Sequence, residues 1–155
     1  MDTLRPKEFS DWVFWIGKIS PLIALTSGLI TLFGTLLIAS TLGHLPKGLW
    51  LPFVSLCGVQ PPERYLYLVG FTVTGICIFL SAIFARWYLF PAVETDLQIY
   101  AHISFYSALL AGCGLIVQAV VPLQSDILNV IDGTAKLQAQ SVVHQTSALV
   151  LFLAG

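Results

Sequence analysis

Four side chains in the sequence could together bind a polar ligand. Glu63 and Arg64 form an adjacent acid and base at the start of a long apolar run, Ser55 lies shortly before them, and His144 begins the last apolar run. A carboxylate, a guanidinium, a hydroxyl and an imidazole supply hydrogen-bond donors, acceptors and charge of both signs. We therefore expect Ser55, Glu63, Arg64 and His144 to contact a polar headgroup or a partner.

Catalysis by these residues has weaker support. Ser55 with His144 is the only nucleophile and base that the sequence places on one face, and no Gly-x-Ser-x-Gly elbow surrounds Ser55. No glycine-rich phosphate loop is present. The histidines His44, His102 and His144 are expected at two different ends of the molecule, which disfavours a three-histidine metal site. We expect no catalytic residue, metal or cofactor, with an intramembrane lipid hydrolase or acyltransferase as an alternative.

The composition is that of a membrane protein. The 155 residues are 57% hydrophobic and 10% charged, and the mean hydropathy is +0.87, whereas soluble domains are roughly 45–50% apolar and about 25% charged. The seven Lys and Arg are spread along the chain, so nucleic acid is excluded as a partner. Membrane lipids are the expected partners.

Three apolar runs predict complete transmembrane helices at about 20–43, 65–88 and 102–122. The first and third carry no charge, and the second carries none before Arg86, where Arg86, Trp87 and Tyr88 form an interfacial anchor. A fourth, at 141–155, is short or truncated, because a crossing needs ~20 residues. The predicted fold is an all-α, polytopic transmembrane helix bundle, with residues 1–155 forming a single transmembrane domain. Small residues, among them Ser27, Gly28, Gly34, Gly70, Thr74, Gly75, Ser104, Ala108 and Gly112, predict close helix packing.

Residues 1–18 form a cytosolic or interfacial segment in this interpretation. Phe9, Trp12, Val13 and Ile16 share one helical face, which fits an interfacial helix or the first turns of a long first span. The distribution of Lys and Arg places the N-terminus in the cytosol and the loops at about 44–64 and 123–140 on the lumenal or external face.

The 44–64 loop contains the residues expected to shape it: Pro52, Gly58, Pro61 and Pro62. Pro61 and Pro62 should hold the backbone extended, and Gly58 should permit a turn that other residues resist. The alternative is an ordinary helix start, in which the prolines precede the helix and Glu63 lies at the positive end of its dipole.

The same loop resembles a known family. Leu51-Pro52-Phe53-Val54-Ser55, then Gly58, then Pro61-Pro62-Glu63-Arg64-Tyr65 is similar to the first-loop signature of the DRAM, FRAG and SFK membrane-protein family. Val142-Val143-His144 with Ala148-Leu149 resembles the start of that family's fourth span. Leu56, where many autophagy-type members have an acid, favours the branch that remodels the lipid of glycosylphosphatidylinositol (GPI) anchors.

The resemblance implies a bundle of five or six helices, of which this chain would be the N-terminal part. It implies an endomembrane protein of the Golgi or endoplasmic reticulum, or alternatively of the lysosomal or plasma membrane. Its expected function is to assist GPI-anchor lipid remodelling or lipid organisation without catalysis of its own, with GPI-anchored proteins or a lipid-modifying membrane enzyme as partners. The alternative is an autophagy- or lysosome-linked membrane regulator. The resemblance supplies no catalytic residue.

Overall fold

The computed structural model describes residues 11–45, 54–90, 95–131 and 133–154, and it is helical throughout these ranges apart from turns. Four longer helices, α1 (Asp11–Thr41), α2 (Glu63–Phe84), α3 (Thr95–Val120) and α5 (Ala139–Ala154), form the bundle. Three short elements join them: the 3₁₀-helix η2 (Leu56–Gly58), the π-helical turn η3 (Ala85–Leu89) that extends α2, and α4 (Ile127–Ile131). The predicted all-α bundle is confirmed.

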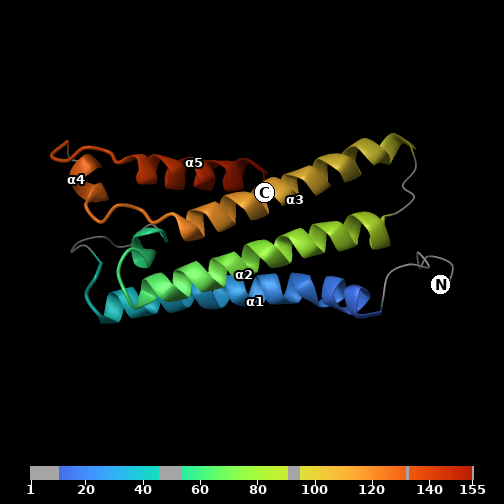
Figure 1. Cartoon of the computed structure of the whole chain (residues 1–155), viewed down its shortest axis with the longest axis horizontal. Helices are drawn as coiled ribbons and strands as arrows, with labels where there is room; N and C mark the ends of the chain where they lie inside the picture. The colour runs from blue at the N-terminus through green and yellow to red at the C-terminus, as the bar shows by residue number, and fades with distance from the viewer. Residues whose placement is uncertain (1–10, 46–53, 91–94, 132, 155) are drawn as a thin grey trace.

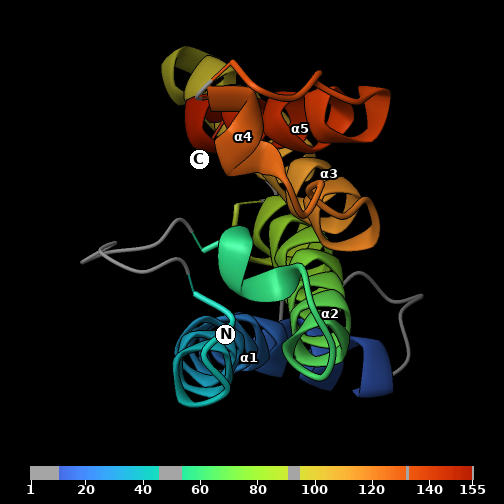
Figure 2. The same cartoon turned by 90° about the vertical axis from the view of Figure 1, so that its left-hand side faces the viewer.

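The longer helices pack in chain order. α1 packs mainly on α2, α2 on α3, and α3 on α5. Successive long helices run antiparallel, with α1 and α5 at opposite edges of the stack (Figures 1 and 2). In this arrangement each long helix keeps a broad face away from its neighbours.

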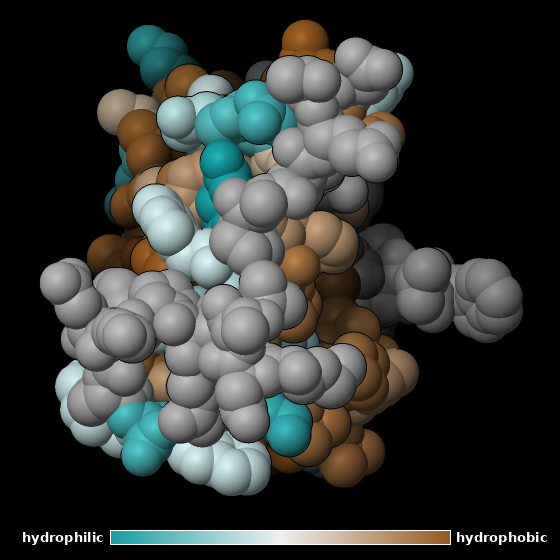
Figure 3. Space-filling view, turned by 90° about the vertical axis from the view of Figure 1, so that its right-hand side faces the viewer, coloured by the Kyte–Doolittle hydropathy of each residue, from teal (hydrophilic) through white to brown (hydrophobic). Residues whose placement is uncertain are grey.

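Those outward faces are apolar, as a lipid environment requires. Exposed large hydrophobic side chains lie along the whole length of the bundle, including Leu22, Ile30 and Phe33 on α1 and Ile99, Ile103 and Leu110 on α3. Figure 3 shows hydrophobic surface on the flanks of the bundle. Three helices, Asp11–Thr41, Glu63–Leu89 and Leu97–Val120, are long and apolar enough to cross a bilayer. The chain is a multi-pass integral membrane protein.

The helix bounds extend the predicted spans. α1 begins at Asp11 and continues through Pro21, so Trp12, Val13 and Ile16 belong to the first turns of one long helix, the second of the two alternatives. It ends where Gly43 adopts a left-handed φ of 72°, with the amide of His44 donating to Ala39 O at 2.9 Å. Phe9 lies outside the described residues, and α5 is a shorter apolar helix of 16 residues.

Close backbone approach at the predicted small residues joins the three spans. Ser27 Oγ donates to the carbonyl oxygen of Gly70 at 3.0 Å, and the side chain of Thr31 lies directly against Gly70. At the α2–α3 crossing, a Cβ on Gly112 would lie 3.1 Å from the carbonyl oxygen of Gly75. These contacts match the small-residue packing that associates helices in lipid.

Candidate headgroup site at the loop end of the bundle

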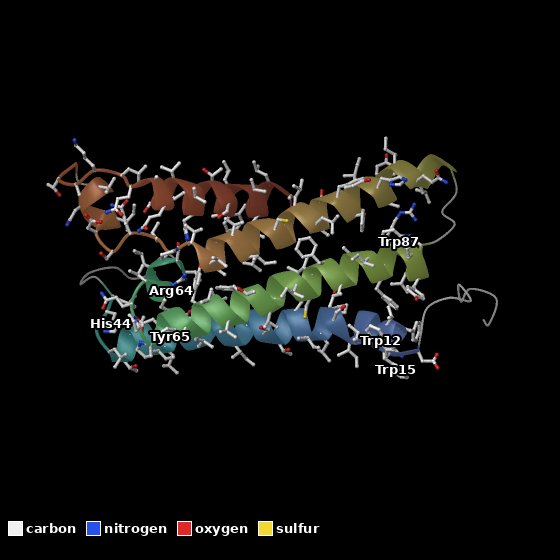
Figure 4. The ribbon with its side chains drawn as sticks, viewed as in Figure 1. Trp12, Trp15, His44, Arg64, Tyr65 and Trp87 are labelled. Carbon is white, nitrogen blue, oxygen red and sulfur yellow. The ribbon has the colours of Figure 1, made fainter. Side chains whose placement is uncertain are left out.

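One end of the bundle gathers the polar residues that the sequence singled out. The last turn of α1, the first turn of α2, the end of α3, and α4 with the start of α5 all lie at this end, where η2 packs against α2 and α1 (Figure 2). Figure 4 places His44, Arg64 and Tyr65 there, with Trp12, Trp15 and Trp87 at the opposite end. We call this region the loop end.

Glu63 pairs with a residue that follows α1. Its Oε1 lies 2.6 Å from Nδ1 of His44, and its side chain is 1% exposed, against 26% for His44. The pair links the start of α2 to the residue that follows α1. Of its two side chains, the imidazole is the one exposed at the surface. The carboxylate of Glu63 is therefore turned inward, and the expectation that it contacts a headgroup or a partner stays a prediction.

Arg64 and His144 both bind the end of α3. Arg64 donates from NH1 to Ala119 O at 2.7 Å and from NH2 to Val120 O at 2.8 Å. His144, on α5, donates from Nδ1 to Val121 O at 2.7 Å, which fixes the proton on Nδ1 because a carbonyl oxygen only accepts. Three consecutive carbonyls that the helix itself leaves without partners are thereby satisfied, and the guanidinium lies at the negative end of the helix dipole.

The other carboxylate oxygen of Glu63 has no such partner. Oε2 is buried and accepts no hydrogen bond from the part of the chain that the structure describes. A buried polar atom without a partner costs about 1–3 kcal/mol, and such atoms are few in native proteins. Glu63 Oε2 is therefore an acceptor that a ligand with an N–H or O–H group would satisfy.

The loop residues serve the structure in ways that differ from the expectation. Pro62 has helical angles, φ −86° and ψ −15°, at the N-cap of α2, so the prediction of an extended backbone there is wrong and the helix-start alternative holds. Pro61 and Pro62 are joined by a cis peptide bond. Gly58 has no positive φ; a side chain on it would collide with the ring of Tyr67. Pro52 lies outside the described residues.

Ser55 precedes η2 and is half-buried. Its carbonyl oxygen accepts from the amide of Gly58 at 3.4 Å, and its hydroxyl makes no capping hydrogen bond to η2. Nδ1 of His144 is bound to Val121 O, and its Nε2 has no hydrogen-bond partner in the described ranges, so no hydrogen bond joins it to Ser55. The nucleophile and base pairing needed by a hydrolase is not assembled here.

Cys57 lies beside the carboxylate and is 1% exposed. Burial raises the pKa of the Cys57 thiol, and the negative charge of Glu63 raises this pKa further. The thiol is thus held in its protonated, poorly nucleophilic form. In the described segments, no group of three or more His, Cys, Asp or Glu is arranged to hold a metal ion. His102 lies in the first third of α3, whereas the loop end contains the last turn of that helix.

Sequence reasoning missed two parts of this region. The Glu63–His44 pair joins two elements across a loop, and nothing in the local pattern points to it. Gln124, 2% exposed, binds the connection to α5: its Oε1 accepts from the amide of Gln138 at 2.8 Å, and its Nε2 donates to Asp126 Oδ1 at 2.8 Å. The sequence places Gln124 directly after Pro122 and Leu123, at the end of the third apolar run. This position is the feature that could have indicated its structural role.

The fold and this region together define a multi-pass helical membrane protein with a buried, partly satisfied acidic site at one end. No protein-family model, curated protein or solved structure matches the chain. The likeness of the first loop to the DRAM, FRAG and SFK family stays a prediction from the sequence.

Proposed function

We propose that this protein binds a lipid headgroup at the loop end and thereby assists the remodelling of GPI-anchor lipids, without catalysis of its own. The observation that carries the proposal is the unpaired oxygen of Glu63, buried beside a partly exposed histidine at the end of a transmembrane helix. That position corresponds to the depth of polar headgroups.

The chemistry of the ligand follows from the acceptor. A buried carboxylate oxygen is satisfied by an ammonium or a hydroxyl group, and a charge-assisted hydrogen bond of this kind is about twice as strong as a neutral one. The headgroup of a GPI lipid offers both groups, on its amino sugar and its inositol. The sequence resemblance to the GPI-remodelling branch supports the same class of ligand. Glu63 would accept from the headgroup, while Arg64 and His144 hold α3 and α5 in place around it.

The experiment compares GPI-anchored proteins from cells with and without this protein. Loss of the protein should shift the fatty-acid composition of the anchors, as read by mass spectrometry, and wild-type protein should restore it. Glu63→Gln should fail to restore it, since the amide offers a weaker acceptor. Asp126→Asn is the matched control at the same end, because an asparagine Oδ1 can still accept from Gln124.

Two results would overturn the proposal. Unchanged anchor lipids in cells without the protein would exclude a role in remodelling, and would favour a regulator of membrane trafficking or autophagy. Lipid turnover by the purified protein, abolished by Ser55→Ala and His144→Ala, would show an enzyme instead.

A further inference from the structure

A second feature lies toward the other end of the bundle. A cavity of about 630 Å³ opens between α1, α2 and α3, and its walls are almost entirely apolar. Its lining includes Ala24 on α1, Ala82 on α2, and Ala101, Ser104 and Ala108 on α3. We call this cavity the α2–α3 groove. Its volume falls within the roughly 300–1,000 Å³ of small-molecule sites.

Small side chains line much of the groove between α2 and α3. α2 and α3 meet at Gly75 and Gly112. Toward Arg86 and Tyr100 the groove lining combines small residues, Ser81, Ala82, Ala85, Ala101 and Ser104, with larger apolar ones such as Phe105, whose ring lies 5.4 Å from that of Trp87. α5 packs on α3 at Gly114, where a Cβ would lie 2.8 Å from the carbonyl oxygen of Ser147. α5 therefore runs beside the C-terminal half of α3 and leaves the N-terminal half without this cover (Figure 1).

A cation lies at the outer end of the groove. Arg86 lines it and uses one donor, NH1, in an exposed hydrogen bond to Phe90 O at 3.2 Å. A guanidinium has five N–H donors, and this hydrogen bond occupies one of them. Trp12, Trp15 and Trp87 cluster at this end (Figure 4), as aromatic side chains do where hydrocarbon meets headgroups.

We propose that the α2–α3 groove binds one acyl chain of an anionic phospholipid, whose phosphate is held by Arg86. The apolar walls exclude a polar ligand, and the arginine at the headgroup level selects a negative charge at the end of the chain. The groove runs between helices that cross the bilayer. An acyl chain bound in it would therefore lie parallel to the lipid chains around the protein. This site is independent of the loop end and of the function proposed for it.

The test uses the full chain in nanodiscs containing a trace of phosphatidylglycerol with a photoreactive acyl chain. Cross-links mapped by mass spectrometry should fall on groove residues of α2 and α3. Ala101→Phe, which fills the groove, should reduce this labelling about tenfold. Cys113→Phe is the matched control, because Cys113 is exposed on the same helix and does not line the groove; it should label as wild type does.

The charge is tested by competition. Unlabelled phosphatidylglycerol should displace the probe better than phosphatidylcholine does, and Arg86→Gln should remove most of that preference. Lys18→Gln is the control, since Lys18 lies over the ring of Trp15 at 5.0 Å and does not line the groove. Thermal unfolding of each variant distinguishes a lost site from a lost fold.

Three outcomes would overturn the proposal. Equal labelling of Ala101→Phe and Cys113→Phe would show that the lipid does not enter the groove. Equal competition by the two lipids in wild type and Arg86→Gln would show that the arginine charge plays no part. Chain-to-chain cross-links at the groove without lipid labelling would assign it to a second copy of the protein.

Discussion

His44 and Glu63 face each other across the gap between α1 and α2, with Nδ1 and Oε1 2.6 Å apart. The carboxylate is buried, whereas the imidazole is partly exposed. The pair therefore fixes the loop-end register of the two helices, while Oε2 of Glu63 stays without a partner among the described residues.

Removing His44 alone should cost more stability than removing both partners. His44→Ala leaves a buried carboxylate with neither hydrogen bond and should lower the free energy of unfolding by about 2 kcal/mol. Adding Glu63→Met, an apolar side chain of similar volume, should recover much of this loss, because the uncompensated charge is gone. Thermal unfolding of the purified variants in detergent measures both effects. A double variant less stable than His44→Ala would contradict this account.

Arg64 should not be replaceable by lysine. Arg64→Lys keeps the charge but loses the planar fork that reaches Ala119 O and Val120 O together. We expect a loss of about 1–3 kcal/mol, together with faster hydrogen exchange in the last turn of α3. Arg86→Lys is the control, since Arg86 makes one exposed bond to Phe90 O, and its effect should be small. Equal stability of the two variants would argue against the capping role of Arg64.

Alanine substitutions at two glycines that face the α1–α2 contact should have different effects on stability. Gly70→Ala would drive a methyl group into Thr31, whereas a Cβ at Gly28 would lie at an ordinary 3.5 Å from Thr74. We expect Gly70→Ala to lower stability by about 1–3 kcal/mol through overpacking and Gly28→Ala to be tolerated. Resistance to unfolding in increasing sodium dodecyl sulfate compares them. Similar behaviour of both variants would mean that the helices do not meet at Gly70.

The Cys57 thiol should report the charge of Glu63. The carboxylate raises the pKa of Cys57, so Glu63→Gln should lower that pKa and increase the thiolate fraction at a given pH. In a Cys77→Ala, Cys113→Ala background, labelling by a small maleimide below the pKa should accelerate on the order of threefold. The pH–rate profile is decisive: a lower midpoint supports the electrostatic effect, while a higher plateau at an unchanged midpoint would mean only that the site has opened.

The transmembrane architecture could be predicted from the sequence because its signal is local. Long runs without charge are sufficient to identify spanning helices, and the three longest such runs correspond to α1, α2 and α3. The start of α1 was ambiguous, since Trp12, Val13 and Ile16 share a face in either an interfacial or a spanning helix. The unbroken course of α1 from Asp11 through Pro21 separates those alternatives, and no single residue pattern could show it.

The candidate site was less accessible to sequence reasoning because its contacts join distant elements. Glu63, Arg64 and His144 could be named from their types, but their partners His44, Ala119, Val120 and Val121 depend on how three helices are aligned. Backbone carbonyls carry no sequence signal at all. The α2–α3 groove likewise depends on where Gly75 meets Gly112, and small residues alone indicate packing as readily as a cavity.

The chain-order stacking of the helices bears on how the protein is made. α1 packs mainly on α2, and α2 on α3, so the principal neighbour of each of these helices is the one next to it in the sequence. Contacts between segments adjacent in sequence form with little loss of chain entropy. The packing in chain order therefore favours assembly of the bundle from its N-terminus, because no helix needs a partner far along the chain to bury its main contact face.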